Sequence, residues 1–240
     1  MVQNKLQRFA AIKTFSNVLE RPQNIAGKWN KIFKNNNPIT LELACGKGEY
    51  TIGLSRLYPN KNCIGVDIKG NRLWVGAKQA MEEALATVAF LRTEIEKIDQ
   101  YFDKNEVSEL WITFPDPQLR NSKAKKRLTH PNFLRLYQNI LIDKGVIHLK
   151  TDSPLLYYFT KYIISIFELT VLNAIDDVYT QSTISTELNI KTYYEGLDIA
   201  KSNRVHYLSF MLDKPLDKSK DIRIKEWRYE EPIGSVKITV

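Results

Sequence analysis

From residue 39 onward, short runs of β-branched and aromatic residues alternate with stretches of helical periodicity. Short apolar runs bounded by turn residues predict strands. We therefore expect seven strands, at residues 39–43, 63–67, 87–92, 108–114, 146–151, 169–173 and 205–212. This alternation predicts an α/β fold, in which a mostly parallel seven-stranded sheet carries helices on both faces.

Helix signals lie between these strands. Apolar residues recur at helical spacing over 73–85 and predict a helix with one apolar face. Thr129 precedes Pro131, and Ser153 precedes Pro154. A capping hydroxyl followed by a first-turn proline predicts a helix start, so two further helices are expected, with bodies at 133–141 and 155–167.

The two ends of the chain differ from this alternating region. Residues 1–36 are basic and end in an Asn-Asn-Asn-Pro turn signal, which predicts an appended arm with some helix. The main domain is then expected at 37–212. Residues 213–240 begin with dense mixed charge and form a C-terminal extension that we expect to pack on the same domain.

Composition narrows the class of protein. The 240 residues include 35 Lys and Arg against 27 Asp and Glu, and the net charge of +8 favours a polyanionic partner. No apolar run is long enough to span a membrane, and the basic arm lacks the apolar core of a secretory signal. Two cysteines and three scattered histidines predict neither a disulfide framework nor a metal site. A reducing cytoplasm fits, with Cys45 and Cys63 as buried apolar residues.

The first predicted strand runs into a glycine turn with the sequence Glu-Leu-Ala-Cys-Gly-Lys-Gly-Glu, residues 42–49. Ligands bind at the carboxyl ends of strands in open α/β sheets, and Gly46 and Gly48 let the backbone approach a ligand. Thr51 stands where a dinucleotide fingerprint needs a third glycine, and Gly48 stands where a P-loop needs Ser or Thr. Hydride transfer and nucleotide hydrolysis are therefore disfavoured.

Three acids follow three successive strands. Glu42 and Asp67 end the first and second strands, and Glu94 follows the third. A carboxylate at the position of Asp67 can accept both hydroxyls of a ribose. Each acid alone could be a solvated surface residue, but together they predict a negative lining that suits a cationic sulfonium cofactor.

A proline-bracketed acid and a basic run follow the fourth strand. Phe-Pro-Asp-Pro at 114–117 holds Asp116 at the sheet edge. Residues 120–127 then carry five cations and no anion, with Arg120 at the start and Arg127 at the end. A charge run is commonly just a solvated face, but beside the cleft it can deliver phosphates. Contact of all five cations with phosphate predicts a slope of log K against log salt of about −3.5 to −4.5.

Two later segments complete the candidate site. Asp152 follows the fifth strand and lies on the same predicted edge as Asp116. Before the last strand, Thr192, Tyr193, Tyr194 and Glu195 could read the edge of a base. The same four residues also fit an ordinary helix start, with Thr192 as N-cap and Glu195 closing a capping box, and both interpretations can hold together.

Taken together, the glycine turn, Asp67, the Phe-Pro-Asp-Pro segment with its basic run, Lys-Thr-Asp at 150–152 and Thr-x-x-Glu at 192–195 resemble the bacterial tRNA (guanine-N7-)-methyltransferases. The resemblance covers about residues 39–212. It implies a Rossmann-like class I methyltransferase fold, S-adenosylmethionine as cofactor and tRNA as substrate, with methyl transfer to N7 of a guanine in the variable loop.

The resemblance also implies residue roles. Those for the cofactor are Glu42, Gly46, Gly48, Asp67, Glu94 and Asp116. Those for the guanine-bearing substrate are Arg120, Asp152, Thr192, Tyr193, Tyr194 and Glu195. The RNA-contacting stretch comprises Ser122, Lys123, Lys125, Lys126 and Arg127. Asp152 is the first candidate for orienting the guanine and stabilising its growing charge, with Glu195 second, and Asp116 beside the cofactor is the other acid expected to be catalytic.

Three positions depart from the family pattern. Ala44 stands in place of a frequent glycine, Gln118 in place of a tryptophan and Arg120 in place of a lysine. We expect Ala44 to adopt an ordinary negative φ, which would leave cofactor binding intact. Arg and Lys differ as donors, so Gln118 and Arg120 bear on substrate contact.

Two rival functions stay open at this point. One is a methyltransferase of a small molecule or protein, and the other is a non-catalytic RNA-binding module that lost the cofactor. Fold alone does not choose between them. We expect a monomer or a homodimer that binds neither a membrane nor a metal ion.

Overall fold

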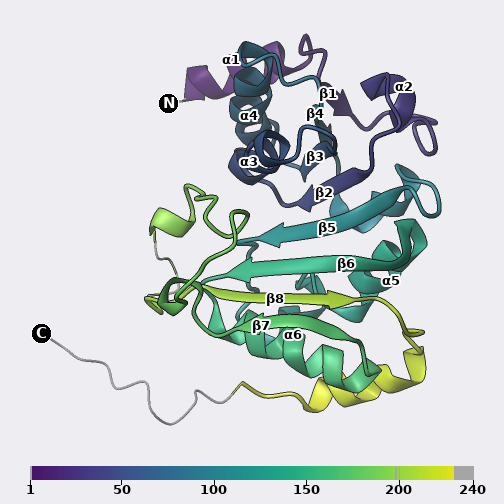
Figure 1. Cartoon of the computed structure of the whole chain (residues 1–240), viewed down its shortest axis with the longest axis vertical. Helices are drawn as coiled ribbons and strands as arrows, with labels where there is room; N and C mark the ends of the chain where they lie inside the picture. Colours follow the sequence, from purple (N-terminus) through teal and green to yellow (C-terminus); the bar gives the residue numbers. More distant parts are fainter. Residues whose placement is uncertain (1, 198, 200, 230–240) are drawn as a thin grey trace, which may run out of the picture.

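The computed structural model describes residues 2–197, 199 and 201–229. Its centre is an eight-stranded sheet in the order β1-β4-β3-β2-β5-β6-β8-β7 (Figure 1). All pairings from β1 to β6 are parallel, whereas β8 runs antiparallel to both β6 and β7. The strands are β1 (Val18–Glu20), β2 (Ile39–Leu43), β3 (Asn62–Asp67), β4 (Val88–Arg92), β5 (Val107–Thr113), β6 (Leu141–Thr151), β7 (Val171–Ile175) and β8 (His206–Met211).

Helices cover both faces of this sheet. The α-helices are α1 (Val2–Ile12), α2 (Trp29–Phe33), α3 (Glu49–Leu57), α4 (Gly70–Glu82), α5 (Pro131–Ile140) and α6 (Pro154–Phe167). The 3₁₀ turns are η1 (Ile95–Gln100), η2 (Asn121–Lys126), η3 (Val178–Thr180), η4 (Glu195–Leu197) and η5 (Lys218–Glu226). The largest apolar cluster joins α2, η1, α5 and α6 to one face, and two smaller clusters join α1, α3 and α4 to the other. The predicted α/β fold is therefore confirmed.

The seven predicted strands are all present, with small shifts at their ends. The strand predicted at 146–151 begins earlier, at Leu141, where one residue pairs with Val107 across an irregularity in the ladder. An eighth strand, β1, was not predicted. It has only three half-buried residues, and it forms because the arm pairs with β4, so that β1 becomes the edge of the sheet.

The predicted helix starts are half right. Ser153 caps α6, since its hydroxyl accepts a hydrogen bond from the backbone N–H of Leu156. At α5 the cap is His130 rather than Thr129, because His130 Nδ1 accepts from the N–H of Asn132 at 3.2 Å. The Thr129 hydroxyl is buried and pairs with that of Thr160 at 2.8 Å, so it links the turn before α5 to α6.

The arm and the C-terminal extension both lie against the sheet's helices. In the arm, α1 packs on α4, and the ring of Phe15 stacks on that of Trp74. Beyond β8, the yellow segment in Figure 1 passes beside α6 and turns back along it. Arg135 of α5 holds Asp221 of that segment through two hydrogen bonds of 2.6 and 3.0 Å. Residues 230–240 of the predicted extension lie outside the described part of the chain.

Among the described residues, no helix combines the length and the apolar character needed to cross a membrane.

Candidate active site

The parallel strands place the predicted acids at one edge of the sheet. Leu43 pairs with Val66 and with Ile112, and Thr113 pairs with Lys150, so the carboxyl ends of β2, β3, β5 and β6 lie side by side. The segment between β7 and β8 folds over the same edge (Figure 1). The glycine turn, Asp67, Asp116 and Asp152 therefore lie along one edge of the sheet, and their predicted roles in one site remain predictions.

The glycine turn is built from left-handed backbone. Gly46 and Gly48 have φ angles of 58° and 76°, and Ala44 also has a positive φ, at 56°. The expectation of a negative φ at Ala44 is therefore wrong. The turn needs a left-handed residue there, and alanine adopts that conformation at a cost of about 1–2 kcal/mol.

Asp67 fastens this turn to the end of β3. One carboxylate oxygen accepts the N–H of Gly46 at 3.0 Å, and the other accepts the N–H of Lys69 at 2.7 Å. Gly48 is needed for a second reason, because a Cβ atom there would lie 2.6 Å from a ring carbon of Phe90. Hydrogen bonds from Asp67 thus hold one side of the turn, and the Phe90 ring packs closely against the other.

Glu42 lies beneath the turn and is 2% exposed. One carboxylate oxygen accepts the backbone N–H of Thr51 at 2.8 Å and also its hydroxyl, and the other accepts the hydroxyl of Thr113 at 2.6 Å. Burial raises the pKa of Glu42 to about 7, against the lowering effect of these hydrogen bonds. Glu42 therefore ties β2 to β5 and to α3. Its predicted contact with the cofactor remains a prediction.

Glu94 forms an ion pair with Arg21, a residue that the sequence pattern does not single out. Arg21, just after β1, donates two hydrogen bonds to the Glu94 carboxylate, at 2.6 and 3.3 Å. Hydrogen bonding by Arg21 lowers the pKa of Glu94 to about 2. The arm therefore compensates one charge of the predicted negative lining. The sequence would have indicated this pairing only through a prediction of β1, the strand that places Arg21 beside the end of β4.

Asp116 is exposed on the loop after β5. One carboxylate oxygen accepts the N–H of Gln118 at 3.0 Å, which closes a tight turn. Phe114 and Gln118 on either side have positive φ angles of 45° and 49°. The prolines alone do not set this loop, because two non-glycine residues are held in left-handed conformation as well.

The basic run divides into exposed and buried cations. Arg120, Lys123, Lys125 and Lys126 are exposed on the loop and on η2, as an RNA-contacting stretch requires, and Ser122 is exposed beside them. Arg127 is 0% exposed, which contradicts its predicted place among the RNA contacts. Its guanidinium turns inward to the carbonyls of Pro117 and Gln118.

Asp152 follows β6 at the same edge and is half-buried. Its backbone carbonyl accepts the hydroxyl of Ser202 at 2.8 Å, which links it to the segment before β8. This position agrees with a role for Asp152 at the strand-end edge, and the role itself remains a prediction.

The Thr192–Glu195 segment starts a 3₁₀ turn, η4. The Thr192 hydroxyl accepts the N–H of Glu195 at 3.1 Å, so the helix-start interpretation is confirmed for Thr192. The Glu195 carboxylate is held elsewhere. It contacts Lys150 Nζ and Lys191 Nζ, each at 3.1 Å, and accepts a hydrogen bond from the hydroxyl of Tyr179.

Lys150, to which the sequence pattern alone assigns no role, is the anchor of this segment. Its side chain is 0% exposed, and Nζ donates to the carbonyls of Leu188 and Ile190 at 2.8 and 3.0 Å. Burial lowers the pKa of Lys150 to about 8, while Glu195 acts in the opposite direction. Lys150 and Glu195 thus fix the segment over the strand ends.

Tyr193 and Tyr194 lie over the glycine turn. A Cβ atom on Gly46 would lie 3.2 Å from ring carbon Cε2 of Tyr194. Lys47 Nζ lies 3.3 Å from the ring centroid of Tyr193, and Arg72 Cζ lies 5.1 Å from that of Tyr194. The segment expected to meet the substrate therefore also touches the expected cofactor turn.

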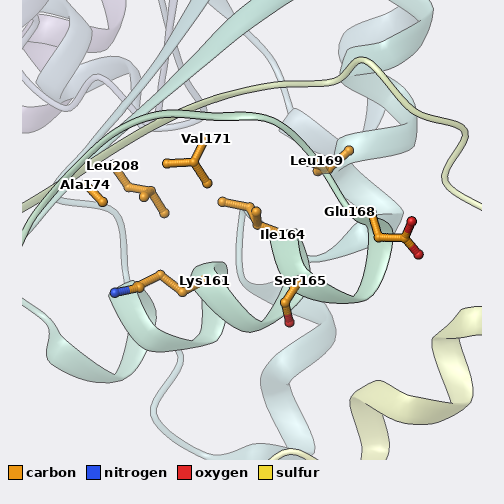
Figure 2. A pocket seen from close by; sticks show the side chains of 8 residues that line it. All are labelled: Lys161, Ile164, Ser165, Glu168, Leu169, Val171, Ala174 and Leu208. Atoms are coloured by element: carbon orange, nitrogen blue, oxygen red, sulfur yellow. The ribbon is translucent and has the colours of Figure 1, made fainter.

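Both cysteines are buried, Cys45 within the glycine turn and Cys63 in β3, and burial raises the pKa of Cys63 to about 12. The depression in Figure 2 lies between α6 and β7 and is mostly apolar. It is lined by Lys161, Ile164, Ser165, Glu168, Leu169, Val171, Ala174 and Leu208.

The strand-end edge fits an adenosyl cofactor. Asp67 is pinned by two backbone amides, and its oxygens keep further lone pairs for ribose hydroxyls. Gly46 and Gly48 allow close approach of the backbone. The fold and this site define a class I S-adenosylmethionine-dependent methyltransferase.

Comparison with known proteins supports the same class of enzyme. The sequence model of a family described as "Putative methyltransferase" matches residues 36–208. The chain is similar to the crystal structure of the 16S rRNA methyltransferase KamB, with a TM-score of 0.60 and 13% identity over 83% of this chain and 99% of that one.

Two curated relatives share far more of the sequence. A tRNA (guanine-N(7)-)-methyltransferase of Bacteroides fragilis is 45% identical over 88% of this chain and 87% of its own. One of Porphyromonas gingivalis is 48% identical over 80% of this chain and 78% of its own. The chain belongs to the tRNA (guanine-N(7)-)-methyltransferase family.

Proposed function

We propose that this chain transfers the methyl group of S-adenosylmethionine to N7 of a guanine in tRNA, in the variable loop, as the family resemblance implies. The observation that carries the proposal is the close approach of the Tyr194 ring to Gly46, where an added Cβ atom would lie 3.2 Å from ring carbon Cε2. It joins the segment assigned to the substrate with the turn assigned to the cofactor, so donor and acceptor would meet at one point of the sheet edge.

The reaction requires little proton chemistry from the protein. Guanine N7 carries an in-plane lone pair and no proton, so no general base has to remove one. The bound cofactor supplies an electrophilic methyl group on a positively charged sulfur. The tasks left to the chain are to align N7 with that methyl group and to stabilise the charge that develops on the purine.

Asp152 is the residue that we assign to these tasks. It directly follows β6, whose Lys150 pairs with Thr113 of β5, whereas Glu195 is committed to Lys150 and Lys191. Asp116 is the second acid of the site, on the loop that leads to Arg120. Arg120 and the three exposed lysines of η2 would hold the phosphates of the tRNA.

The test is methyl transfer from labelled S-adenosylmethionine to unmodified tRNA, followed by chemical cleavage at 7-methylguanosine. We expect one cleavage site. The variant Asp152→Asn should retain the wild-type affinity for the cofactor and lose at least 100-fold in turnover. Asp143→Asn, an exposed acid at the opposite end of β6, is the matched control and should retain full activity.

Three outcomes would contradict this proposal. Wild-type turnover in Asp152→Asn would remove its assigned role. Methylation that persists after ribonuclease treatment of an extract would indicate a protein or small-molecule substrate. A failure to bind S-adenosylmethionine in calorimetry would favour the non-catalytic RNA-binding module. We also propose that the protein is cytoplasmic and is either a monomer or a homodimer.

A further inference from the structure

The segment after β8 contacts the one cation of the basic run that is buried. Arg127 is 0% exposed, and its Cζ lies 4.5 Å from the ring centroid of Phe159 and 5.2 Å from that of Trp227. The two rings are 5.2 Å apart and nearly perpendicular, at 77°. Phe159 belongs to α6, whereas Trp227 comes from the C-terminal segment, so two distant elements enclose the guanidinium.

Arg127 holds two consecutive carbonyls of the active-site loop. Nε lies 3.3 Å from the carbonyl oxygens of both Pro117 and Gln118, and Nη2 donates to that of Gln118 at 3.1 Å. These carbonyls lie between Asp116 and Arg120. The guanidinium therefore fixes the stretch of backbone that sets the positions of both side chains.

The burial of this cation is costly and calls for an explanation. Arg127 has no carboxylate partner among the described residues, and its Nη1 is buried without a hydrogen-bond partner there. Burial lowers the pKa of Arg127 to about 10. An apolar side chain would avoid this cost, but it would have no donors for the carbonyls.

The loop after β5 contains backbone conformations that the surrounding structure has to stabilise. Phe114 and Gln118 both have positive φ, which costs about 1–2 kcal/mol for each non-glycine residue. Such conformations persist only where the surroundings determine them. The planar fork of Arg127 donates to the Gln118 carbonyl, and the Trp227 ring packs against this fork.

We propose that Trp227 and Arg127 are positioning residues for the active site, so that the C-terminal segment sets the conformation of the Asp116–Arg120 loop. The contribution of these two residues to methyl transfer rests on the proposed function. Their effect on the loop conformation does not depend on that function, and it is measured separately.

The first measurement is hydrogen–deuterium exchange of the backbone amides of Gln118 and Lys123. Both are hydrogen-bonded within the loop, to the Asp116 carboxylate and to the Arg120 carbonyl. We expect their exchange to accelerate at least fivefold in Trp227→Ala and in Arg127→Lys, which keeps the charge but loses the fork. Trp227→Phe should restore the wild-type rate.

Tyr162→Phe is the matched control. Tyr162 donates a hydrogen bond to the carbonyl of Arg223 in the same segment but does not contact Arg127. Its loop amides should exchange at the wild-type rate. If Trp227→Ala does not fold, Trp227→Leu, which keeps an apolar side chain but no ring, takes its place with the same expected result.

The second measurement is kinetic. In Trp227→Ala and Arg127→Lys, kcat on tRNA should fall at least tenfold, while the Kd for S-adenosylmethionine stays within threefold of the wild type. Wild-type exchange at Gln118 and Lys123 in both variants would overturn the positioning role. Accelerated exchange with unchanged kcat would overturn its link to catalysis. If the wild type methylates no tRNA, the proposed function fails, and the exchange result still decides the positioning.

Discussion

Lys150 Nζ lies 3.1 Å from a carboxylate oxygen of Glu195, and the two side chains are 0% and 6% exposed. The pair joins the end of β6 to the segment that covers the glycine turn. It gives Glu195, expected to meet the substrate, a structural task as well.

The first prediction concerns this buried pair. Glu195→Gln leaves the Lys150 ammonium buried without its counter-charge, so it should destabilise the protein by about 3–5 kcal/mol. Lys150→Met should lose less in the Glu195→Gln background than in the wild type, because the pair is already broken. Urea unfolding of the two single variants and the double variant measures this coupling. Additive losses would show that the pair contributes nothing as a unit.

The second prediction concerns the left-handed residue at position 44. Ala44→Gly should raise the free energy of unfolding by about 1 kcal/mol, since glycine adopts φ of 56° without steric cost. For a chain of this size that corresponds to about 2–4 °C in Tm. Ala77→Gly, inside α4, is the control and should destabilise the protein. A loss of stability in Ala44→Gly would contradict the assigned strain.

The third prediction concerns pH. Burial raises the pKa of Glu42 to about 7 in the folded protein, from an ordinary value of 4.5. Between these values the folded state binds a proton that the unfolded state has released, so the contribution of Glu42 to stability falls as pH rises. Relative to Glu42→Gln, the wild type should lose up to about 3 kcal/mol between pH 4.5 and 7.

Urea unfolding of both proteins at pH 5 and pH 7.5 checks this. The pKa values of the buried His130, His148 and His206 are lowered, which acts in the opposite direction, but they are common to both proteins and cancel in the difference. A difference that does not change with pH would show that Glu42 titrates normally.

The fourth prediction concerns the basic run. With Arg127 buried, four cations remain for phosphate, so the expected salt slope of log K is about −2.8 to −3.6 instead of the value for five. Replacement of Lys123, Lys125 and Lys126 by Gln should reduce the slope by about 2–3. The same change at Lys28, Lys31 and Lys34, exposed around α2 before the amino end of β2, should leave it nearly unchanged. Equal effects of the two sets would indicate non-specific attraction.

Local patterns were sufficient to predict most of the fold. The strands 39–43 and 63–67 could be located because β-branched runs ended in turn residues, and Ser153 with Pro154 marked the start of α6. Strand β1 could not be predicted in the same way. Its three residues carry no alternation, and they are extended because they pair with β4.

The candidate site was predicted to the level of strand ends but not of side-chain partners. Arg127 looks like any other cation of the run, and its burial depends on Phe159 and Trp227, which are remote in the sequence. The same holds for Lys150 and Glu195. The sign of φ at Ala44 follows from the tight attachment of the turn to Asp67, which no residue-type preference reports.

The most direct test of methyl transfer to guanine N7 uses tRNA transcribed with 7-deazaguanosine, in which a C–H group replaces N7. The account predicts that this tRNA binds within about threefold of normal tRNA and accepts no labelled methyl group from S-adenosylmethionine, whereas the unmodified transcript is methylated. Methylation of both transcripts at similar rates would contradict it.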